Sequence, residues 1–102
     1  MKQLSVIIVS YNVKYYLEQC LSAVVKALSR LDAEIIVFDN HSRDGSVAYL
    51  SKRFPDVNFI SSNHNVGFAK ANNRAIHQSS GRYVLLLNPD TIVGEHTLYD
   101  AV

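Results

Sequence analysis

Residues 4–28 read LSVIIVSYNVKYYLEQCLSAVVKAL and hold the pattern that decides the fold. An unbroken apolar run, Val6-Ile7-Ile8-Val9, is followed by a polar break and then by apolar residues spaced three or four apart over residues 13–28. A short continuous apolar run indicates a strand covered on both faces, and the wider spacing indicates an amphipathic helix. The stretch therefore predicts a strand followed by a helix.

The same unit recurs along the rest of the chain. Apolar runs at 35–38, 57–60 and 84–87 predict three more strands, and helical spacing in 47–54 and 68–76 predicts two more helices. Pro55 ends the first of these helices, and Gly81 lies just beyond the second. Strands that alternate with helices are typical of an α/β domain whose parallel strands are joined by right-handed crossovers.

Length and composition narrow the class of protein. The chain has 102 residues, enough for one domain, and its net charge is +1, so no overall field recruits nucleic acid. No apolar run approaches the roughly 20 residues of a membrane span, which makes a cytoplasmic protein the expectation. Cys20 stands alone among apolar residues and predicts a reduced, buried thiol. The sequence ends inside a helical pattern that begins near Thr97, so we expect a fragment of a longer protein.

Polar residues follow each of the four predicted strands, and ligands of open α/β sheets bind beyond the carboxyl ends of strands. The clusters are Ser10-Tyr11-Asn12, residues 39–46 (DNHSRDGS), residues 62–68 (SNHNVGF) and Asn88-Pro89-Asp90. The first strand is followed by neither a GxGxxG nor a GK[ST] motif, which argues against a dinucleotide site and a P-loop. A nucleotide here would be held by side chains, chiefly carboxylates and an aromatic ring.

Four motifs at these positions resemble the opening of a family 2 glycosyltransferase, an enzyme of the GT-A fold that moves a sugar from a nucleotide diphosphate to an acceptor. They are SVIIVSYN at 5–12, VFDNHSRDGS at 37–46, NVGFAKANN at 65–73 and LNPD at 87–90, in the family's order and spacing. The third and fourth most resemble rhamnosyltransferase-like members of cell-surface polysaccharide assembly. The resemblance implies a Rossmann-like, mostly parallel sheet with flanking helices, truncated, forming a single nucleotide-sugar-binding domain over residues 1–102.

Carried over motif by motif, the resemblance gives the site residues separate roles. Tyr11 matches the ring that packs on the donor's pyrimidine base, and Asp39 matches the carboxylate that hydrogen-bonds the uracil or thymine edge. Asp90 matches the carboxylate that holds a divalent cation, magnesium or manganese, against the diphosphate. Asn88 departs from the first acid of the family's pair, which removes one charge. The other expected substrate-binding residues are Ser10, Asn12, Asn40, Asn65, Gly67 and Asn72.

Several of these positions also have a structural explanation. Asp39 would serve as a cap for the turn after its strand, and Asp44-Gly45-Ser46 is typical of a capped helix start. Phe68 is expected in the core rather than against a ligand. Asn72 is a poor helix former within a helix, which indicates that its amide bonds either to neighbouring loops or to the nucleotide.

The resemblance implies transfer from a UDP- or dTDP-activated donor to a polysaccharide or lipid-linked acceptor. The catalytic base and the acceptor half are expected beyond Val102, so this chain alone is predicted to be inactive. We also expect it to self-associate as a homo-oligomer, because residues 84–87 and the terminal helix would expose apolar surface, with exchange of the segment from Thr91 to Val102 between two chains. Peripheral membrane association is expected only of the full-length protein. The alternative is a non-catalytic α/β module, flavodoxin-like or receiver-like, that binds a protein partner. A receiver would need paired acids where Ser10-Tyr11-Asn12 stands.

Overall fold

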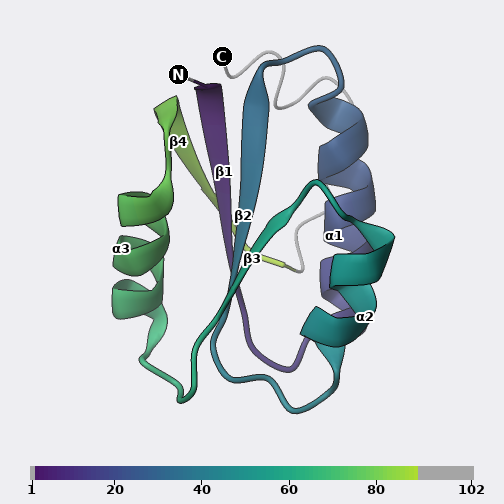
Figure 1. The fold of residues 1–102 in the computed structure, drawn as a ribbon, viewed down its shortest axis with the longest axis vertical. Helices are drawn as coiled ribbons and strands as arrows, with labels where there is room; N and C mark the ends of the chain where they lie inside the picture. Colours follow the sequence, from purple (N-terminus) through teal and green to yellow (C-terminus); the bar gives the residue numbers. More distant parts are fainter. Residues whose placement is uncertain (1, 90–102) are drawn as a thin grey trace.

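A parallel sheet with helices on both faces makes up the computed structural model, which describes residues 2–89 (Figure 1). The predicted alternation of strands and helices is confirmed. None of the described helices is long and apolar enough to cross a membrane. In chain order the elements are β1 (Lys2–Ser10), α1 (Lys14–Ala27), β2 (Ala33–Asp39), α2 (Ser46–Arg53), β3 (Asn58–Ser61), α3 (Phe68–Gln78) and β4 (Gly81–Leu87).

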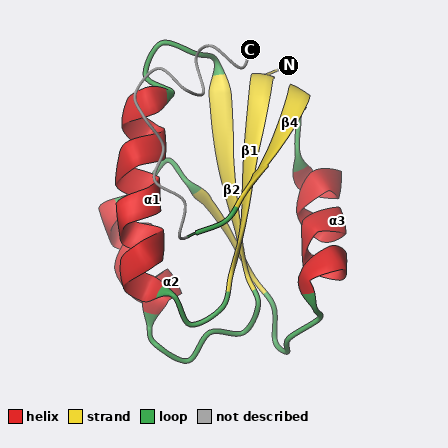
Figure 2. Ribbon diagram, turned by 180° about the vertical axis from the view of Figure 1, so that it is seen from behind, coloured by secondary structure: helices red, strands yellow, loops and turns green. Residues whose placement is uncertain are grey.

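The strand order is β3-β2-β1-β4, and each neighbouring pair is parallel. The chain moves outward from β1 to β2 and β3, and it then crosses back so that β4 lies on the other side of β1. Because the direction of crossover reverses, α1 and α2 cover one face of the sheet and α3 covers the other (Figures 1 and 2). The point of reversal lies between β1 and β4, where open α/β sheets bind their ligands.

Two apolar layers hold the helices to the sheet, and alternate residues of β1 serve opposite layers. Val6 and Ile8 pack with α1 residues such as Leu21, whereas Ile7 packs with Phe38 and with small residues of α3. A fully buried leucine, isoleucine or phenylalanine contributes about 1.5–3 kcal/mol, so these layers dominate the stability of the domain. The predicted burial of Cys20 within the α1 layer is confirmed.

One strip of the sheet is left open on the α3 side. Because α3 packs mainly against β1 and β2, the part of that face formed by β4 has little cover from it. Val84 and Leu86 pair in register with Ser5 and Ile7, and they are 42% and 49% exposed. The expectation of exposed apolar residues within 84–87 is confirmed at these two positions, while Leu87 packs against the α1 layer.

Candidate functional site

A groove of about 750 Å³ lies at the reversal point between β1 and β4. It combines the end of β1, the start of α1, the first residue of α3 and the two residues that follow β4. Parallel strands bring these segments to one edge, as the sequence analysis predicted for the polar clusters. The lining residues are Val9, Tyr11, Val13, Tyr16, Phe68, Asn88 and Pro89.

Three aromatic rings line this groove, and Tyr11, Tyr16 and Phe68 are 50%, 60% and 61% exposed. The expectation that Phe68 belongs to the core is wrong. Phe68 is the first residue of α3, and the residues of that helix that pack on the sheet begin one turn later, at Ala71 and Ala75. The helical spacing correctly indicated an apolar stripe, but the helix starts at the strand ends, which leaves the first ring of the stripe beside the groove.

Asp39 lies at the end of β2, directly beside Ser10 in the register of the two strands. Its Oδ2 accepts the backbone N–H of Ser42 at 2.9 Å, so the predicted cap of the following turn is confirmed. Asp39 is only 3% exposed, and within residues 2–89 neither its Oδ1 nor the Oγ of Ser10 has a hydrogen-bond partner. A buried acceptor without a donor costs roughly 1–3 kcal/mol, so Oδ1 is an acceptor with hydrogen-bonding capacity left over, although Asp39 is not among the residues that line the groove.

Asn12 ties the loop after β1 to the loop after β2. Its backbone N–H donates to Ser42 Oγ at 2.9 Å, and its Oδ1 accepts the backbone N–H of Arg43 at 2.7 Å. The residue adopts a left-handed conformation, with φ at 52°, which asparagine tolerates better than most side chains do. The Oδ1 of Asn12 is therefore engaged by the neighbouring loop.

The side chain of Asn40 joins the loop after β2 to the loop after β3 by hydrogen bonds. Its Oδ1 accepts the N–H of Val66 at 2.8 Å, and its Nδ2 donates to the carbonyl of Gly67 at 3.3 Å. Asn65 accepts the N–H of Gly67 at 2.8 Å, and Gly67 itself has φ at 84°, a conformation that favours glycine just before a helix. Asn40 and Asn65 thus set the path of the chain into α3.

Asn72 is buried in α3, and its Nδ2 donates to the carbonyl of Phe68 at 3.2 Å. Of the two partners predicted for this amide, a neighbouring loop or a nucleotide, the described contact is neither. It stays within the helix and reaches back one turn. Asn72 therefore supports the position of Phe68, which lines the groove.

Asp44 joins the starts of two helices. Its Oδ2 accepts the N–H of Lys14 in α1, and its Oδ1 accepts the N–H of Ser46 in α2, each at 3.0 Å. Partial burial alone would raise the pKa of Asp44, but the hydrogen bonds from Ser46 and Lys14 outweigh it and lower the pKa overall. The cap position of α2 is Gly45, which makes no side-chain cap, so the predicted capping comes from the residue before it.

The expected cation site is only partly within the described residues. Asn88 lines the groove, and its backbone carbonyl accepts the thiol of Cys20 at 3.9 Å. Asp90 lies outside the described residues. Residues 2–89 contain no group of three His, Cys, Asp or Glu side chains that could hold a metal. Of the residues expected at the cation site, the described part of the chain therefore places Asn88, which stands at the groove.

Comparison with known proteins gives a consistent family assignment. The model of Glycosyl transferase family 2 matches residues 5–102. The chain is 29% identical over 105 residues to the poly(ribitol-phosphate) beta-N-acetylglucosaminyltransferase TarS of Staphylococcus aureus, covering 99% of this chain and 18% of the relative. It is 36% identical over 91 residues to the poly-beta-1,6-N-acetyl-D-glucosamine synthase of Staphylococcus aureus, covering 87% of this chain and 22% of the relative.

A solved structure shows the same arrangement of strands and helices. The crystal structure of Staphylococcus aureus TarS 1-349 in complex with UDP superposes with a TM-score of 0.85 at 27% sequence identity, over 97% of this chain and 30% of that one. The chain therefore spans about a fifth of the curated relatives and under a third of this solved neighbour. The fold is GT-A, and the chain belongs to glycosyl transferase family 2.

Proposed function

We propose that the groove between β1 and β4 binds the nucleoside diphosphate of an activated sugar, as the donor half of a glycosyltransferase. The observation that carries this proposal is the group of exposed rings, Tyr11, Tyr16 and Phe68, on one groove at the reversal point of the sheet. An aromatic side chain stacked on a base contributes roughly 1–3 kcal/mol. Membership of the family supports a sugar-transferring role over the alternative of a partner-binding module.

Asp39 favours uracil or thymine as the base. Its unsatisfied Oδ1 is an acceptor, and the N3 atom of uracil or thymine carries the hydrogen that such an acceptor needs. Cytosine has no hydrogen on N3 and offers its exocyclic N4 amine instead, so it would have to meet the carboxylate through a different part of its edge. Asp39 is buried and does not line the groove, so the proposal requires the loop that carries it to open toward the base. UDP and dTDP are accordingly the proposed donor nucleotides, and the UDP complex of the similar TarS structure supports this choice.

Asp90 and Asn88 would lie beside the diphosphate, with Asp90 as the ligand of a magnesium or manganese ion. Such a cation neutralises the negative charge of the departing diphosphate. The amide of Asn88 supplies an uncharged oxygen where a second acid would bring another charge. We therefore propose a cation held by one carboxylate of this chain together with the phosphates.

In the proposed transfer, an acceptor hydroxyl oxygen bonds to the anomeric carbon of the sugar. The bond from that carbon to the diphosphate breaks, and its electron pair leaves with the nucleoside diphosphate. The hydroxyl proton passes to a base that we expect beyond Val102. The names of the two relatives support a polysaccharide or lipid-linked polymer of the cell envelope as acceptor. A rhamnosyl donor stays a prediction from the third and fourth motifs.

Calorimetric titration of UDP, dTDP and CDP, with manganese and with chelator, tests the two roles. Asp39→Ala should weaken UDP binding by about 1–3 kcal/mol under both conditions, because it removes a charge-assisted hydrogen bond. Asp90→Ala should abolish only the enhancement by manganese. Asp56→Ala is the matched control, since it removes an exposed acid before β3. Equal losses for both variants under both conditions would show that the roles are wrongly assigned.

A further inference from the structure

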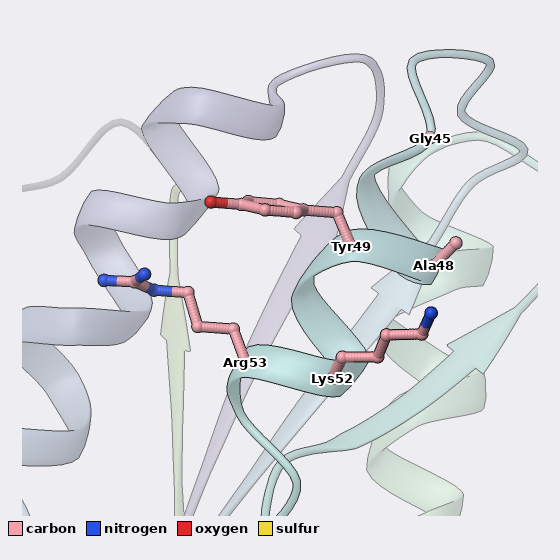
Figure 3. A pocket seen from close by; sticks show the side chains of 5 residues that line it. All are labelled: Gly45, Ala48, Tyr49, Lys52 and Arg53. Carbon is pink, nitrogen blue, oxygen red and sulfur yellow. The ribbon is translucent and has the colours of Figure 1, made fainter.

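The donor groove adjoins a second hollow through shared residues, and Lys14 of the second hollow lies 4.8 Å from the ring of Tyr49, which lines a third. The groove shares Val13 and Tyr16 with a hollow of about 380 Å³ at the start of α1, which Lys14, Tyr15 and Asp44 also line. Gly45, the next residue after Asp44, borders a third hollow of about 570 Å³ on the outer side of α2 (Figure 3). We call this the tyrosine track and define it by Lys14, Tyr15, Tyr16, Tyr49, Lys52 and Arg53.

Exposed tyrosine rings line the track along its length. Tyr15 is 71% exposed, and Tyr16 and Tyr49 are exposed as well. None of the three belongs to the apolar layers that hold α1 and α2 to the sheet. A tyrosine ring offers a flat apolar face together with a polar hydroxyl, which suits the C–H faces and hydroxyl groups of a sugar or polyol unit.

Cationic side chains lie between these rings. The Nζ atom of Lys14 is 4.8 Å from the centre of the Tyr49 ring and 5.7 Å from that of Tyr15. Lys52 extends from α2 at the other side of the third hollow (Figure 3). Within residues 2–89, Lys14 and Lys52 form no ion pair, so both positive charges remain available to an anionic ligand.

One carboxylate fixes the outer end of the track in place. Oε2 of Glu18 in α1 accepts the hydroxyl of Tyr49 at 2.7 Å and pairs with Nε of Arg53 at 3.3 Å. Figure 3 shows that Tyr49 and Arg53 both extend from α2 toward α1. The hydrogen bond to Glu18 raises the pKa of Tyr49, so the phenol stays neutral at physiological pH. The ring and the guanidinium are thus held ready before any ligand binds.

We infer that the tyrosine track binds the distal part of an anionic glycopolymer, a chain of sugar or polyol units joined by phosphodiesters. This inference rests on the proposed function, because the polymer's acceptor end would lie at the donor groove. The hollows carry the cations Lys14, Lys52 and Arg53. Arg53 pairs with Glu18, and Asp44 is the one carboxylate among the described lining residues, so positive charge is in excess. Exposed rings together with this excess suit polyol units joined by phosphates better than they suit a neutral glycan. A track of linked hollows also suits an extended chain better than it suits the flat surface of a membrane.

Binding of a synthetic ribitol-phosphate oligomer to the 102-residue chain tests the inference. Lys52→Gln and Tyr15→Ala should each raise the dissociation constant roughly three- to tenfold, because each removes one charge or one stacking face. Added salt should weaken binding of the unchanged chain. Lys26→Gln is the matched control, since it removes an exposed lysine from the last turn of α1, at the opposite end of that helix from Lys14. Neither Lys52→Gln nor Tyr15→Ala should change the affinity for UDP.

Two results would overturn the inference. One is equal binding of a neutral β-1,6-linked N-acetylglucosamine oligomer of the same length. The other is binding of phosphatidylglycerol vesicles that depends on Lys52 while the phosphate oligomer does not bind, which would assign the track to a membrane surface. Because UDP titration is scored separately, a chain that binds the oligomer but not UDP contradicts the proposed donor site and leaves the track supported.

Discussion

Tyr11 is the residue of the first motif that presents an exposed aromatic ring to the groove. Ser10 before it is buried, and the Oδ1 of Asn12 after it is engaged by a neighbouring loop, whereas the Tyr11 ring is half exposed over the groove. The sequence pattern that ends β1 therefore places one free aromatic face at the reversal point of the sheet.

Tyr11→Ala should weaken UDP binding by about 1–3 kcal/mol because a stacking face is lost, while Tyr11→Phe should retain most of the affinity. Isothermal titration with UDP measures both variants. Tyr83→Ala is the matched control, because Tyr83 is an equally exposed tyrosine near the start of β4, at the opposite end of the sheet. A Tyr11→Ala variant that binds UDP as tightly as the Tyr83 control would remove Tyr11 from the site.

Asn40 contributes to stability through the hydrogen bonds that join its loop to the loop before α3. Asn40→Ala removes the oxygen that accepts the partly buried backbone N–H of Val66. The substitution should therefore lower the free energy of unfolding by about 1–3 kcal/mol. Urea denaturation followed by circular dichroism measures the change. Asn73→Ala, an exposed asparagine of α3, should change the free energy of unfolding far less. Equal stability of the two variants would show that the amide of Asn40 does not hold the loops together.

At the scale of elements, a carboxylate network joins β1, β2 and the start of β4 at the amino ends of the strands. Glu34 accepts hydrogen bonds from Ser5 Oγ at 2.5 Å and from the backbone of Ser80 at 2.6 Å, and Ser5 Oγ accepts the N–H of Gly81 at 2.7 Å. A Cβ atom on Gly81 would overlap the backbone of Ser5, so glycine permits the close approach of β4. The network holds the start of β4 in place, and β4 leads to Asn88, which lines the groove.

Glu34 makes the stability of this network dependent on pH. Partial burial alone would raise its pKa, but the hydrogen bonds from Ser5 and Ser80 outweigh burial and hold the pKa below the ordinary value of 4.5. A lowered folded-state pKa contributes stability above the unfolded-state value, and that stability is lost as the pH falls through the folded-state pKa.

Glu34→Gln should therefore be less stable than the unchanged chain at pH 7, and the difference should shrink as the pH falls below 4.5. Chemical denaturation at a series of pH values measures this. The reason is that glutamine keeps the side-chain shape but carries no titrating group. A difference between the two chains that stays constant down to about pH 3 would contradict the assigned role.

At the scale of the whole molecule, the uncovered strip of β4 is the feature most exposed to association. Val84 and Leu86 present exposed apolar side chains on β4, which is an edge strand of the described sheet. The unpaired backbone groups of an edge strand can pair with another chain. We expect the 102-residue chain to sediment as a dimer or larger species at about 100 μM. Leu86→Lys should shift it to monomer, because a lysine opposes edge pairing. A monomeric unchanged chain at that concentration would contradict the expectation.

The elements were predictable because their apolar spacing is local. The runs around Ile7 and Ile36 and the stripe through Leu21 each report their own segment. Strand order depends on contacts far apart in sequence, such as that between Glu34 and Ser80, and no spacing encodes it. The sequence pattern wrongly predicts a buried Phe68 for the same reason, because the exposure of its side chain depends on where α3 begins relative to the sheet.

For the candidate site, too, the sequence motifs locate the loops but do not distinguish the roles of the residues within them. The motifs correctly marked the loops that meet at the carboxyl ends of the strands, because parallel strands all end at one edge. They did not separate residues that face the groove, such as Tyr11, from residues that hold its loops, such as Asn40 and Asn65. Both kinds are polar and follow strands, and only three-dimensional hydrogen bonding tells them apart.

Amide chemical-shift mapping of the isotope-labelled chain with UDP and magnesium tests the central claim most directly. Binding in the groove between β1 and β4 predicts that the largest shifts fall on Tyr11, Phe68 and Asn88, with smaller ones on Asp39. Residues on the outer side of α2, such as Lys52, should stay unshifted. The largest shifts on α2 or along β3, or no shifts at saturating UDP, would contradict the assignment of the groove as the donor site.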